Sequence, residues 1–361
     1  MAKIIFLTEE IIKAGGIVRV VNMWANYFAK RGDNIQIIAS DIDNPFYSFD
    51  EKIKIFQRDF SFKRKILGIP YNIFQTYRLL KKLQTEDDVN LVVDRAIHIE
   101  PIWIFRKLGL FKNLNLIYFA HGGSSDFRDF YMSRLHMRHK VGMMFDAFNK
   151  VICLYDDTKN YPKQVKKDKL FFISNPLPFS PSSVTFQKKE NIVLSLGRVT
   201  KEKGIDTLIK AWSKIQSDTN DWKLQIIGDG RDKKKFLKLA HELNLSNIEF
   251  LDSNKNVKSF YEKAKIFVIP SLFEGMPMTI LEAMACSCVV ISTKTAGGNK
   301  LIENNKNGVL VEIENENDLV YALDTLFKNN SKMIELAKNG YNNVQKYKIE
   351  DIEKYWEDIL I

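Results

Sequence analysis

Several common features are absent from this chain of 361 residues, and each absence excludes a class of protein. No run of about 18 apolar residues occurs, so the sequence predicts no membrane-spanning helix. The first ten residues, MAKIIFLTEE, lack the basic start and long apolar stretch of a secretory signal. Only three cysteines occur, Cys153, Cys286 and Cys288, and we expect the last two to serve core packing rather than metal or redox chemistry. These absences predict a cytoplasmic protein.

Acidic residues are scarce relative to basic ones in the first half of the chain. Residues 1–180 hold 28 Lys and Arg against 19 Asp and Glu, whereas the remainder holds 26 against 25. The excess gathers in residues 52–82, where basic side chains alternate with large apolar ones and Asp59 is the single acidic residue. We call the following seven residues the basic patch: Arg58, Lys63, Arg64, Lys65, Arg78, Lys81 and Lys82.

The basic patch has three interpretations, which the sequence leaves open. Cations interleaved with large apolar side chains suit an anionic membrane surface, where each basic residue contributes about 1 kcal/mol. The protein would then make peripheral contact with the inner face of the cytoplasmic membrane. The same pattern also describes a solvated helix face above a core stripe. Nucleic acid is the third interpretation, but no nucleic-acid fold signature accompanies the charge.

Strand and helix patterns alternate along the chain in two successive series. The first series predicts buried strands at residues 3–7, 35–39, 91–93, 116–119, 151–154 and 170–173. The second predicts strands at residues 192–196, 223–227, 248–251, 267–269, 288–291 and 309–312. Residues 175–190, rich in Pro and Ser, separate the two series and predict a linker. Such alternation predicts an α/β protein of two Rossmann-like domains, whose parallel sheets face an interdomain cleft.

The segment 267–298 carries most of the functional information. It predicts a strand, a turn rich in Gly and Pro, a helix opening near Pro277, a second strand and a turn at Gly297 and Gly298. The amino-terminal end of such a helix presents free N–H groups and favours an anion. Glu274 and Glu282 lie before and inside the helix, and carboxylates accept hydrogen bonds from sugar hydroxyls. A helix with a glutamate near its start is also an ordinary capping arrangement.

Four motifs in this order resemble those of retaining glycosyltransferases of the GT-B fold, chiefly glycosyltransferase family 4. They are AGGIVRV at residues 14–20, LGRVTKEKG at 196–204, IIGDG at 226–230, and the two glutamates separated by seven residues in EGMPMTILE at 274–282. The resemblance implies an acceptor-binding domain over residues 1–178, a donor-binding domain over 179–345, and a helix over 346–361 that packs back on the first domain.

The resemblance also implies roles for individual residues. Glu282 would bind the ribose of the donor and Glu274 the transferred sugar, while Arg198 and Lys203 would neutralise the diphosphate. A cradle for sugar and phosphate is implied at Gly275, Met276, Pro277, Met278 and Thr279. The alternative interpretation of Arg198 and Lys203 is that they are ordinary surface residues of a basic protein, with no role in binding.

Three further glycines and one histidine match the motifs by position. Gly16 would approach the donor phosphates, and Gly228 and Gly230 would lie beside the nucleotide, although the latter pair also fits an ordinary turn. His121 would face the donor sugar, although a lone histidine is more often a packed side chain. The chain departs from the family at Ile17 and Val18, which replace an acidic and basic pair.

The implied chemistry uses no metal and no cofactor other than the nucleotide diphosphate sugar as co-substrate. The pair Asp41 and Asp43 has the spacing of a manganese motif, but acidic turn residues are common after such a strand. We therefore predict a glycosyltransferase that takes a sugar from a nucleotide diphosphate donor and transfers it to a glycan or polyprenyl-diphosphate-linked acceptor. We expect the donor to be a UDP-sugar. An epimerase of nucleotide sugars, or a sugar-nucleotide-binding protein without transfer activity, would share the fold.

Overall fold

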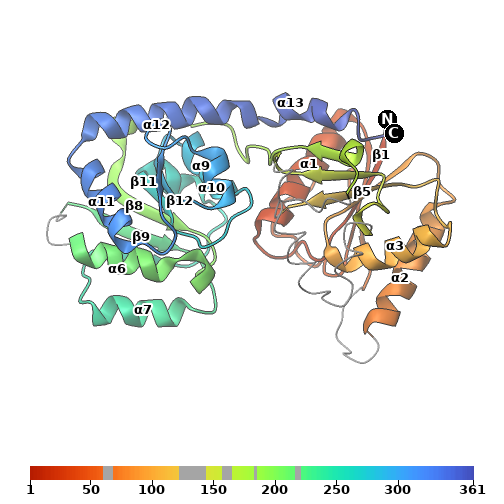
Figure 1. Ribbon diagram of the computed structural model, residues 1–361, viewed down its shortest axis with the longest axis horizontal. Coiled ribbons are helices and arrows are strands. Elements are labelled where there is room, and N and C mark those ends of the chain that lie inside the picture. Colours follow the sequence, from red (N-terminus) through yellow and green to blue (C-terminus); the bar gives the residue numbers. More distant parts are fainter. Residues whose placement is uncertain (60–67, 122–143, 157–164, 183–184, 216–220) are drawn as a thin grey trace. The chain divides into compact units, whose positions relative to one another are not determined.

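The computed structural model describes residues 1–59, 68–121, 144–156, 165–182, 185–215 and 221–361, which Figure 1 traces in colour. They form two compact units, each considered by itself. Unit 1 consists of Met1–Pro176 and Ile349–Ile361, and unit 2 of Leu177–Lys348. Lys63, Arg64 and Lys65 of the basic patch lie outside the described residues. None of the described helices is both long and apolar enough to cross a membrane.

Unit 1 is built on a parallel sheet of seven strands in the order β3-β2-β1-β4-β5-β6-β7. Its strands are β1 (Lys3–Leu7), β2 (Asn34–Ala39), β3 (Lys54–Gln57), β4 (Val89–Val93), β5 (Asn115–Ala120), β6 (Lys150–Cys153) and β7 (Leu170–Phe172). Its main helices are α1 (Gly16–Arg31), α2 (Gly68–Leu83) and α3 (Ile99–Lys107). β4 and β5 are buried along their whole length, as expected of strands covered on both faces.

One strand of unit 1 has no counterpart in the sequence interpretation. β3 lies inside the basic stretch and pairs with β2 at the edge of the sheet. Three of its four residues are exposed and the fourth is half-buried, and its two apolar residues are adjacent, so the segment lacks the alternating burial pattern of a strand. Short, charged strands are a common way to protect a sheet edge from pairing with other chains.

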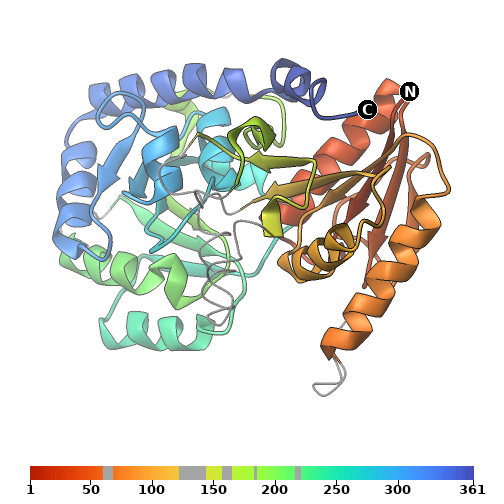
Figure 2. The same cartoon turned by 45° about the vertical axis from the view of Figure 1, so that its right-hand side comes forward.

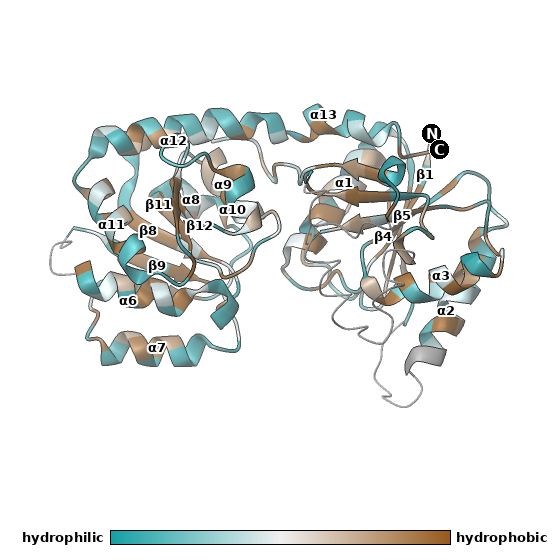
Figure 3. Ribbon diagram, viewed as in Figure 1, coloured by the Kyte–Doolittle hydropathy of each residue, from teal (hydrophilic) through white to brown (hydrophobic). Residues whose placement is uncertain are grey.

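Unit 2 is built on a parallel sheet of six strands in the order β10-β9-β8-β11-β12-β13. The strands are β8 (Glu190–Leu196), β9 (Lys223–Ile227), β10 (Ile248–Leu251), β11 (Ala264–Ile269), β12 (Val289–Thr293) and β13 (Val309–Val311). The helices are α6 (Ile205–Ile215), α7 (Lys233–Glu242), α8 (Lys258–Lys263), α9 (Met278–Ala285), α10 (Ala296–Leu301), α11 (Glu316–Phe327) and α12 (Asn330–Val344). Figure 3 shows hydrophobic residues concentrated in the strands, whereas the helices carry both kinds. The predicted α/β fold with two parallel sheets is confirmed.

The two units divide inside the segment predicted as a linker, between Pro176 and Leu177, and the described residues that follow pack on unit 2. Phe186 and Lys189 are buried, and the backbone N–H of Ser182 donates to the carbonyl of Ala285 at 2.9 Å. The Ser182 hydroxyl donates to the Glu262 carboxylate at 2.8 Å. Prolines and serines mark irregular backbone, and irregular backbone can also pack against a domain, so the composition did not show where the linker ends.

The last residues of the chain return to unit 1. The resemblance implied one helix over residues 346–361, but α13 (Ile349–Ile352) is followed by a 3₁₀ turn, Glu353–Trp356. The Trp356 ring lies 5.3 Å from the rings of both Trp24 and Phe28. The Asn115 side-chain amide donates to the carbonyl of Ile359 at 2.8 Å, which attaches this segment to β5. Figures 1 and 2 both show the two chain ends side by side in this unit.

One smaller feature of the predicted pattern also differs. Gly297 and Gly298 do not form a turn but lie in α10, whose amino-terminal end is capped by the Thr295 hydroxyl. The hydroxyl accepts a hydrogen bond from the backbone N–H of Gly298 at 3.1 Å. A capping threonine before a short helix was the signal that could have predicted it.

Candidate functional site

The candidate site lies at the carboxyl edge of the unit 2 sheet. β8, β11 and β12 are neighbours in this parallel sheet, so the loops after them emerge at one edge. These loops hold residues 197–204, 270–277 and 294–295. Open α/β sheets bind ligands at this edge, where the helix that follows a strand begins. Arg198, Lys203 and Glu274 therefore lie on loops of one edge, although they come from distant parts of the sequence.

Lys203 and Glu274 meet directly at this edge. The Lys203 ammonium lies 2.5 Å from the Glu274 carboxylate, and the Ser271 hydroxyl donates to the same oxygen at 2.7 Å. Both side chains are mostly buried, with 25% of Lys203 and 12% of Glu274 exposed. Partial burial strengthens an ion pair because less water screens it. The structure thus brings together the residue predicted for the diphosphate and the residue predicted for the sugar.

Backbone contacts hold the two loops that carry this ion pair. The N–H of Leu272 donates to the carbonyl of Glu202 at 2.9 Å, which joins the loop after β11 to the turn before α6. Gly204 has a φ of +64°, and a Cβ there would lie 2.0 Å from the carbonyl oxygen of Pro270. The Thr293 hydroxyl donates to the carbonyl of Ser271 at 2.5 Å. Glycine at 204 is therefore required by the close approach of the two loops.

The predicted cradle leads from this loop into α9. Pro277 is the N-cap residue, and the N–H groups of Met278 and Thr279 begin the helix, where they have no intrahelical partner. Gly297 packs against the cradle, and a Cβ on it would lie 2.4 Å from the carbonyl oxygen of Gly275. The side chains of Met276 and Met278 are buried, so these residues offer their backbone rather than their side chains to a ligand.

Glu282 has a different environment from Glu274. Its side chain is buried in α9, with 2% of the residue exposed. The Tyr261 hydroxyl, from α8, donates to its carboxylate at 2.8 Å. Sequence reasoning missed Tyr261, because no spacing rule connects α8 with α9. The two glutamates are therefore held by different partners, one by a lysine and a serine and the other by a tyrosine.

The turn after β9 packs on the loop after β8, which contains Arg198. A Cβ at Gly228 would lie 1.9 Å from the carbonyl oxygen of Gly197, and one at Gly230 would lie 2.2 Å from that of Val199. The N–H of Val199 also donates to the carbonyl of Asp229 at 3.0 Å. Close approach of two backbones thus gives both glycines a packing reason. The Arg198 side chain is exposed.

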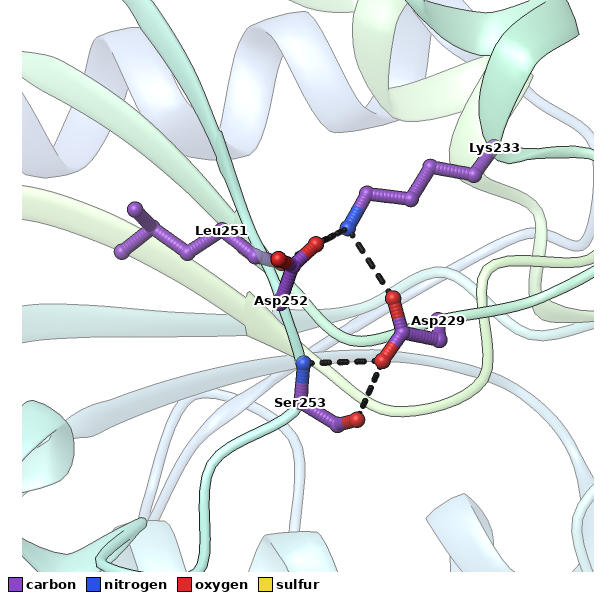
Figure 4. A network of polar contacts seen from close by, with 5 residues as sticks. All are labelled: Asp229, Lys233, Leu251, Asp252 and Ser253. Atoms are coloured by element: carbon purple, nitrogen blue, oxygen red, sulfur yellow. Dashed lines mark hydrogen bonds and ion pairs between the residues drawn. The ribbon is translucent and has the colours of Figure 1, made fainter.

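A network of polar contacts beside this turn was not predicted (Figure 4). The Ser253 hydroxyl and backbone N–H both donate to the Asp229 carboxylate, and Lys233 lies 3.2 Å from its other oxygen. These hydrogen bonds lower the pKa of Asp229 to about 2. Lys233 also contacts Asp252 at 2.6 Å and donates to the carbonyl of Leu251. The network connects the ends of β9 and β10 with the start of α7.

In unit 1, His121 follows β5 at the carboxyl edge of the sheet. Its ring stacks on Phe119, with the ring centroids 4.2 Å apart. Burial and the nearby Arg95 lower its pKa to about 3, so the imidazole is neutral. Among the described residues neither ring nitrogen has a hydrogen-bond partner. A neutral imidazole offers one donor and one acceptor, which suits a hydroxyl-bearing ligand.

Gly16 is the first residue of α1, and it is exposed. A Cβ at Gly16 would meet nothing within 4 Å, so packing in the described structure does not require a glycine at this position. It differs in this respect from Gly228 and Gly230. Open space beside the amino-terminal end of a helix leaves room for an anionic group.

The described part of the basic patch combines cations with exposed aromatic rings on α2 and β3. Phe74 is 54% exposed and Phe56 is 44% exposed. The Arg78 guanidinium lies over the Phe74 ring at 5.7 Å, and the Lys82 ammonium lies 6.0 Å from the Phe56 ring. The Arg58 guanidinium donates to the carbonyl of Gln75 at 2.9 Å, and its pKa is lowered by burial and by Arg78. Lys81 is exposed beside them.

Within the described ranges, no three or more His, Cys, Asp or Glu side chains come close enough together to hold a metal ion. The three cysteines are buried and free of disulfides.

Known proteins resemble this chain over its whole length. An uncharacterized glycosyltransferase of Haemophilus influenzae is 29% identical over 100% of both chains. The amylovoran biosynthesis glycosyltransferase AmsD of Erwinia amylovora is 24% identical over 100% of both. A Campylobacter jejuni enzyme, named as an α-1,4-N-acetyl-D-galactosaminyltransferase acting on a diphospho-undecaprenol-linked glycan, is 26% identical over 100% of this chain and 98% of its own.

Solved structures share the fold. TarM of S. aureus, in a complex with UDP and glycan ligands, has a TM-score of 0.77 and 18% identity over 99% of both chains. Anabaena HepE, in complex with UDP-glucose, has a TM-score of 0.75 and 15% identity over 99% of both chains.

Two family models match consecutive parts of the chain. The model described as Glycosyltransferase Family 4 matches residues 14–179, and the model described as Glycosyl transferases group 1 matches residues 178–343. The first begins at the exposed glycine turn before α1, and the second contains the Lys203–Glu274 pair and the whole of α9. The chain therefore belongs to the GT-B glycosyltransferases, in the family that these two models describe.

Proposed function

We propose that this protein is a retaining, metal-independent glycosyltransferase that uses a UDP-sugar. It transfers the sugar to a hydroxyl of a glycan or a lipid-linked acceptor during the assembly of a surface polysaccharide, O-antigen or related glycan. Unit 2 holds the donor and unit 1 the acceptor. The observation that carries the proposal is the meeting of Lys203 and Glu274 beside the start of α9.

The donor site follows from the charges at this edge. The Lys203 ammonium and the exposed Arg198 guanidinium bind the diphosphate, and the first N–H groups of α9 add to their positive potential. Glu274 binds the sugar hydroxyls, Glu282 the ribose hydroxyls, and His121 the sugar. Before the donor binds, Glu274 neutralises Lys203. The incoming diphosphate then replaces Glu274 as the ion-pair partner of Lys203.

The reaction requires stabilisation of the leaving group. The bond between the sugar C1 and the diphosphate oxygen breaks, and a bond from the acceptor oxygen to C1 forms on the same face of the sugar. The acceptor proton passes to the departing diphosphate, so no separate base is required. Lys203 and Arg198 stabilise the negative charge that grows on the diphosphate as the bond breaks.

Relatives support the choice of substrates. HepE and TarM have each been solved with a uridine nucleotide, which favours a UDP-sugar. The names of the Erwinia and Campylobacter relatives favour a polysaccharide or a polyprenyl-diphosphate-linked acceptor. Such an acceptor is anchored in a membrane, and the cations and exposed aromatic rings of α2 and β3 suit the surface of anionic lipids.

The donor assignment is tested by ligand binding and product analysis. Because a ligand that binds the native state raises the melting temperature, UDP-sugars should raise it more than sugar nucleotides of other bases. The product should keep the anomeric configuration of the donor by NMR, with and without EDTA. An isomerised sugar from donor alone would indicate an epimerase. Absence of transfer or hydrolysis with every donor that binds would indicate a binding protein.

The membrane contact is tested by flotation with liposomes. Charge reversal of Arg78, Lys81 and Lys82 should abolish binding to vesicles that contain an anionic lipid. The matched control reverses three exposed lysines on α7, Lys234, Lys235 and Lys238, and should leave binding unchanged. Equal flotation of all three proteins, or equal flotation with neutral lipid, would contradict the membrane contact.

A further inference from the structure

Glu282 is an ionisable group buried with little contact to solvent. Only 2% of the residue is exposed, and a buried carboxylate is costly unless hydrogen bonds compensate it. The Tyr261 hydroxyl supplies such a bond at 2.8 Å, and Tyr261 itself is fully buried. Hydrogen bonds to an ionised acceptor are roughly twice as strong as neutral ones. The pair is thus a strong contact between α8 and α9.

Tyr261 is held in place by packing as well as by this bond. Its ring meets the Phe267 ring edge to face, with centroids 5.4 Å apart and planes inclined at 66°. Phe267 belongs to the central strand β11, so the tyrosine ring packs directly on the sheet. Rotation of the ring away from Glu282 would disrupt this contact.

The backbone of Tyr261 is also fixed, by a buried lysine. The Lys189 ammonium donates to the carbonyls of Tyr261 at 2.7 Å, Glu262 at 3.1 Å and Ala264 at 3.0 Å. Lys189 is 5% exposed, and these carbonyls lie at the end of α8, where a helix leaves carbonyls without intrahelical partners. The lysine therefore holds the end of the short helix that carries Tyr261.

We propose that Tyr261 is a positioning residue for donor binding, which orients the Glu282 carboxylate toward the two ribose hydroxyls of the nucleotide. The inference rests on the proposed function, because it takes Glu282 as the ribose ligand. A carboxylate has about four acceptor positions, and Tyr261 occupies one of those on Oε2. By fixing the rotation of the carboxylate, Tyr261 sets the direction in which it meets the vicinal diol. Lys189 contributes indirectly, because it holds the end of α8, the helix that carries Tyr261.

Tyr261→Phe removes the hydroxyl and keeps the ring that packs on Phe267. The dissociation constants of UDP and of 2′,3′-dideoxy-UDP are measured by calorimetry for the wild type and the variant. We expect Tyr261→Phe to weaken UDP binding about tenfold and to leave binding of the dideoxy compound nearly unchanged. A purely structural role would weaken both nucleotides equally. Tyr347→Phe, at another buried tyrosine of unit 2, is the matched control and should change neither constant.

A double-mutant cycle separates this inference from the proposed function. If Tyr261 acts through Glu282, Tyr261→Phe should have no further effect on UDP binding in a Glu282→Ala background. Equal weakening of both nucleotides, or a full tenfold loss in the Glu282→Ala background, would overturn the role of Tyr261 alone. A wild-type protein that binds UDP no more tightly than dideoxy-UDP would overturn both the ribose assignment and this inference.

Discussion

At the scale of single residues, the two glutamates of the predicted motif show how spacing and contact differ. Glu274 and Glu282 are eight positions apart, yet one pairs with Lys203 and the other with Tyr261. The first contact is partly exposed and ionic, so a charged ligand can compete for it. The second is buried, so solvent and ligands have less access to it.

Lys203→Ala should lower kcat by about 10²-fold or more, because one charge contact to the developing diphosphate is worth roughly 3 kcal/mol in the transition state. Steady-state kinetics with saturating UDP-sugar measure the effect. Lys201→Ala is the control, since Lys201 lies on the same turn with an exposed side chain. A kcat equal to that of the wild type would refute the role of Lys203.

At the scale of elements, the loops at the carboxyl edge of the unit 2 sheet form one packed layer. The loop after β8 contacts the turn after β9 and the loop after β11, in each case through a glycine that lacks room for a Cβ. Gly228 and Gly204 are the two such positions with positive φ. Since Arg198, Lys203 and Glu274 lie on these same loops, packing of the layer determines how these three side chains are placed.

Gly228→Ala should lower the free energy of unfolding by about 2 kcal/mol or more, because its Cβ would collide with the backbone at Gly197 and its φ of +143° is strained for alanine. Denaturant unfolding measures the change. Gly16→Ala is the contrasting variant: its Cβ meets nothing within 4 Å, so stability should change by less than about 0.5 kcal/mol. Equal stability of the two variants would contradict the packing argument.

At the scale of the whole molecule, the chain passes from unit 1 to unit 2 and then returns. The return places Trp356 on the aromatic cluster of Trp24, Phe28 and Phe119. Asn90 and the backbone of Ile361 exchange hydrogen bonds, which anchor the end of the chain beside β4. The last residues of the chain therefore form part of the packed core of unit 1.

Trp356→Ala should lower the stability of unit 1 by about 3 to 5 kcal/mol, because it leaves a large cavity in a buried cluster. Hydrogen exchange measured on the amides of β1 and α1, against those of β8 and β11, locates the loss. We expect faster exchange in unit 1 and little change in unit 2. Tyr355→Ala removes a neighbouring ring that is 50% exposed and should have a minor effect. A uniform loss across both units would show that Trp356 does not act on unit 1 alone.

The strands could be predicted where burial imposes a pattern. β1, β9 and β10 have the predicted bounds, because their apolar residues are bounded by turn signals. β3 was missed because an exposed edge strand carries little apolar signal. The helix over residues 346–361 was predicted too long, because its apolar spacing is also satisfied by a 3₁₀ turn that inserts Trp356 into a neighbouring cluster.

The sequence by itself determined the alternation of strands and helices, the parallel sheets and the two glutamates before and inside α9. These features depend on backbone preference and on burial over a few neighbouring residues, which a sequence records directly. Only the tertiary structure decided that Lys203 meets Glu274 across 71 positions and that Tyr261 holds Glu282. Such contacts depend on which strands lie side by side in the sheet, and strand order brings together residues whose separation along the chain carries no geometric information.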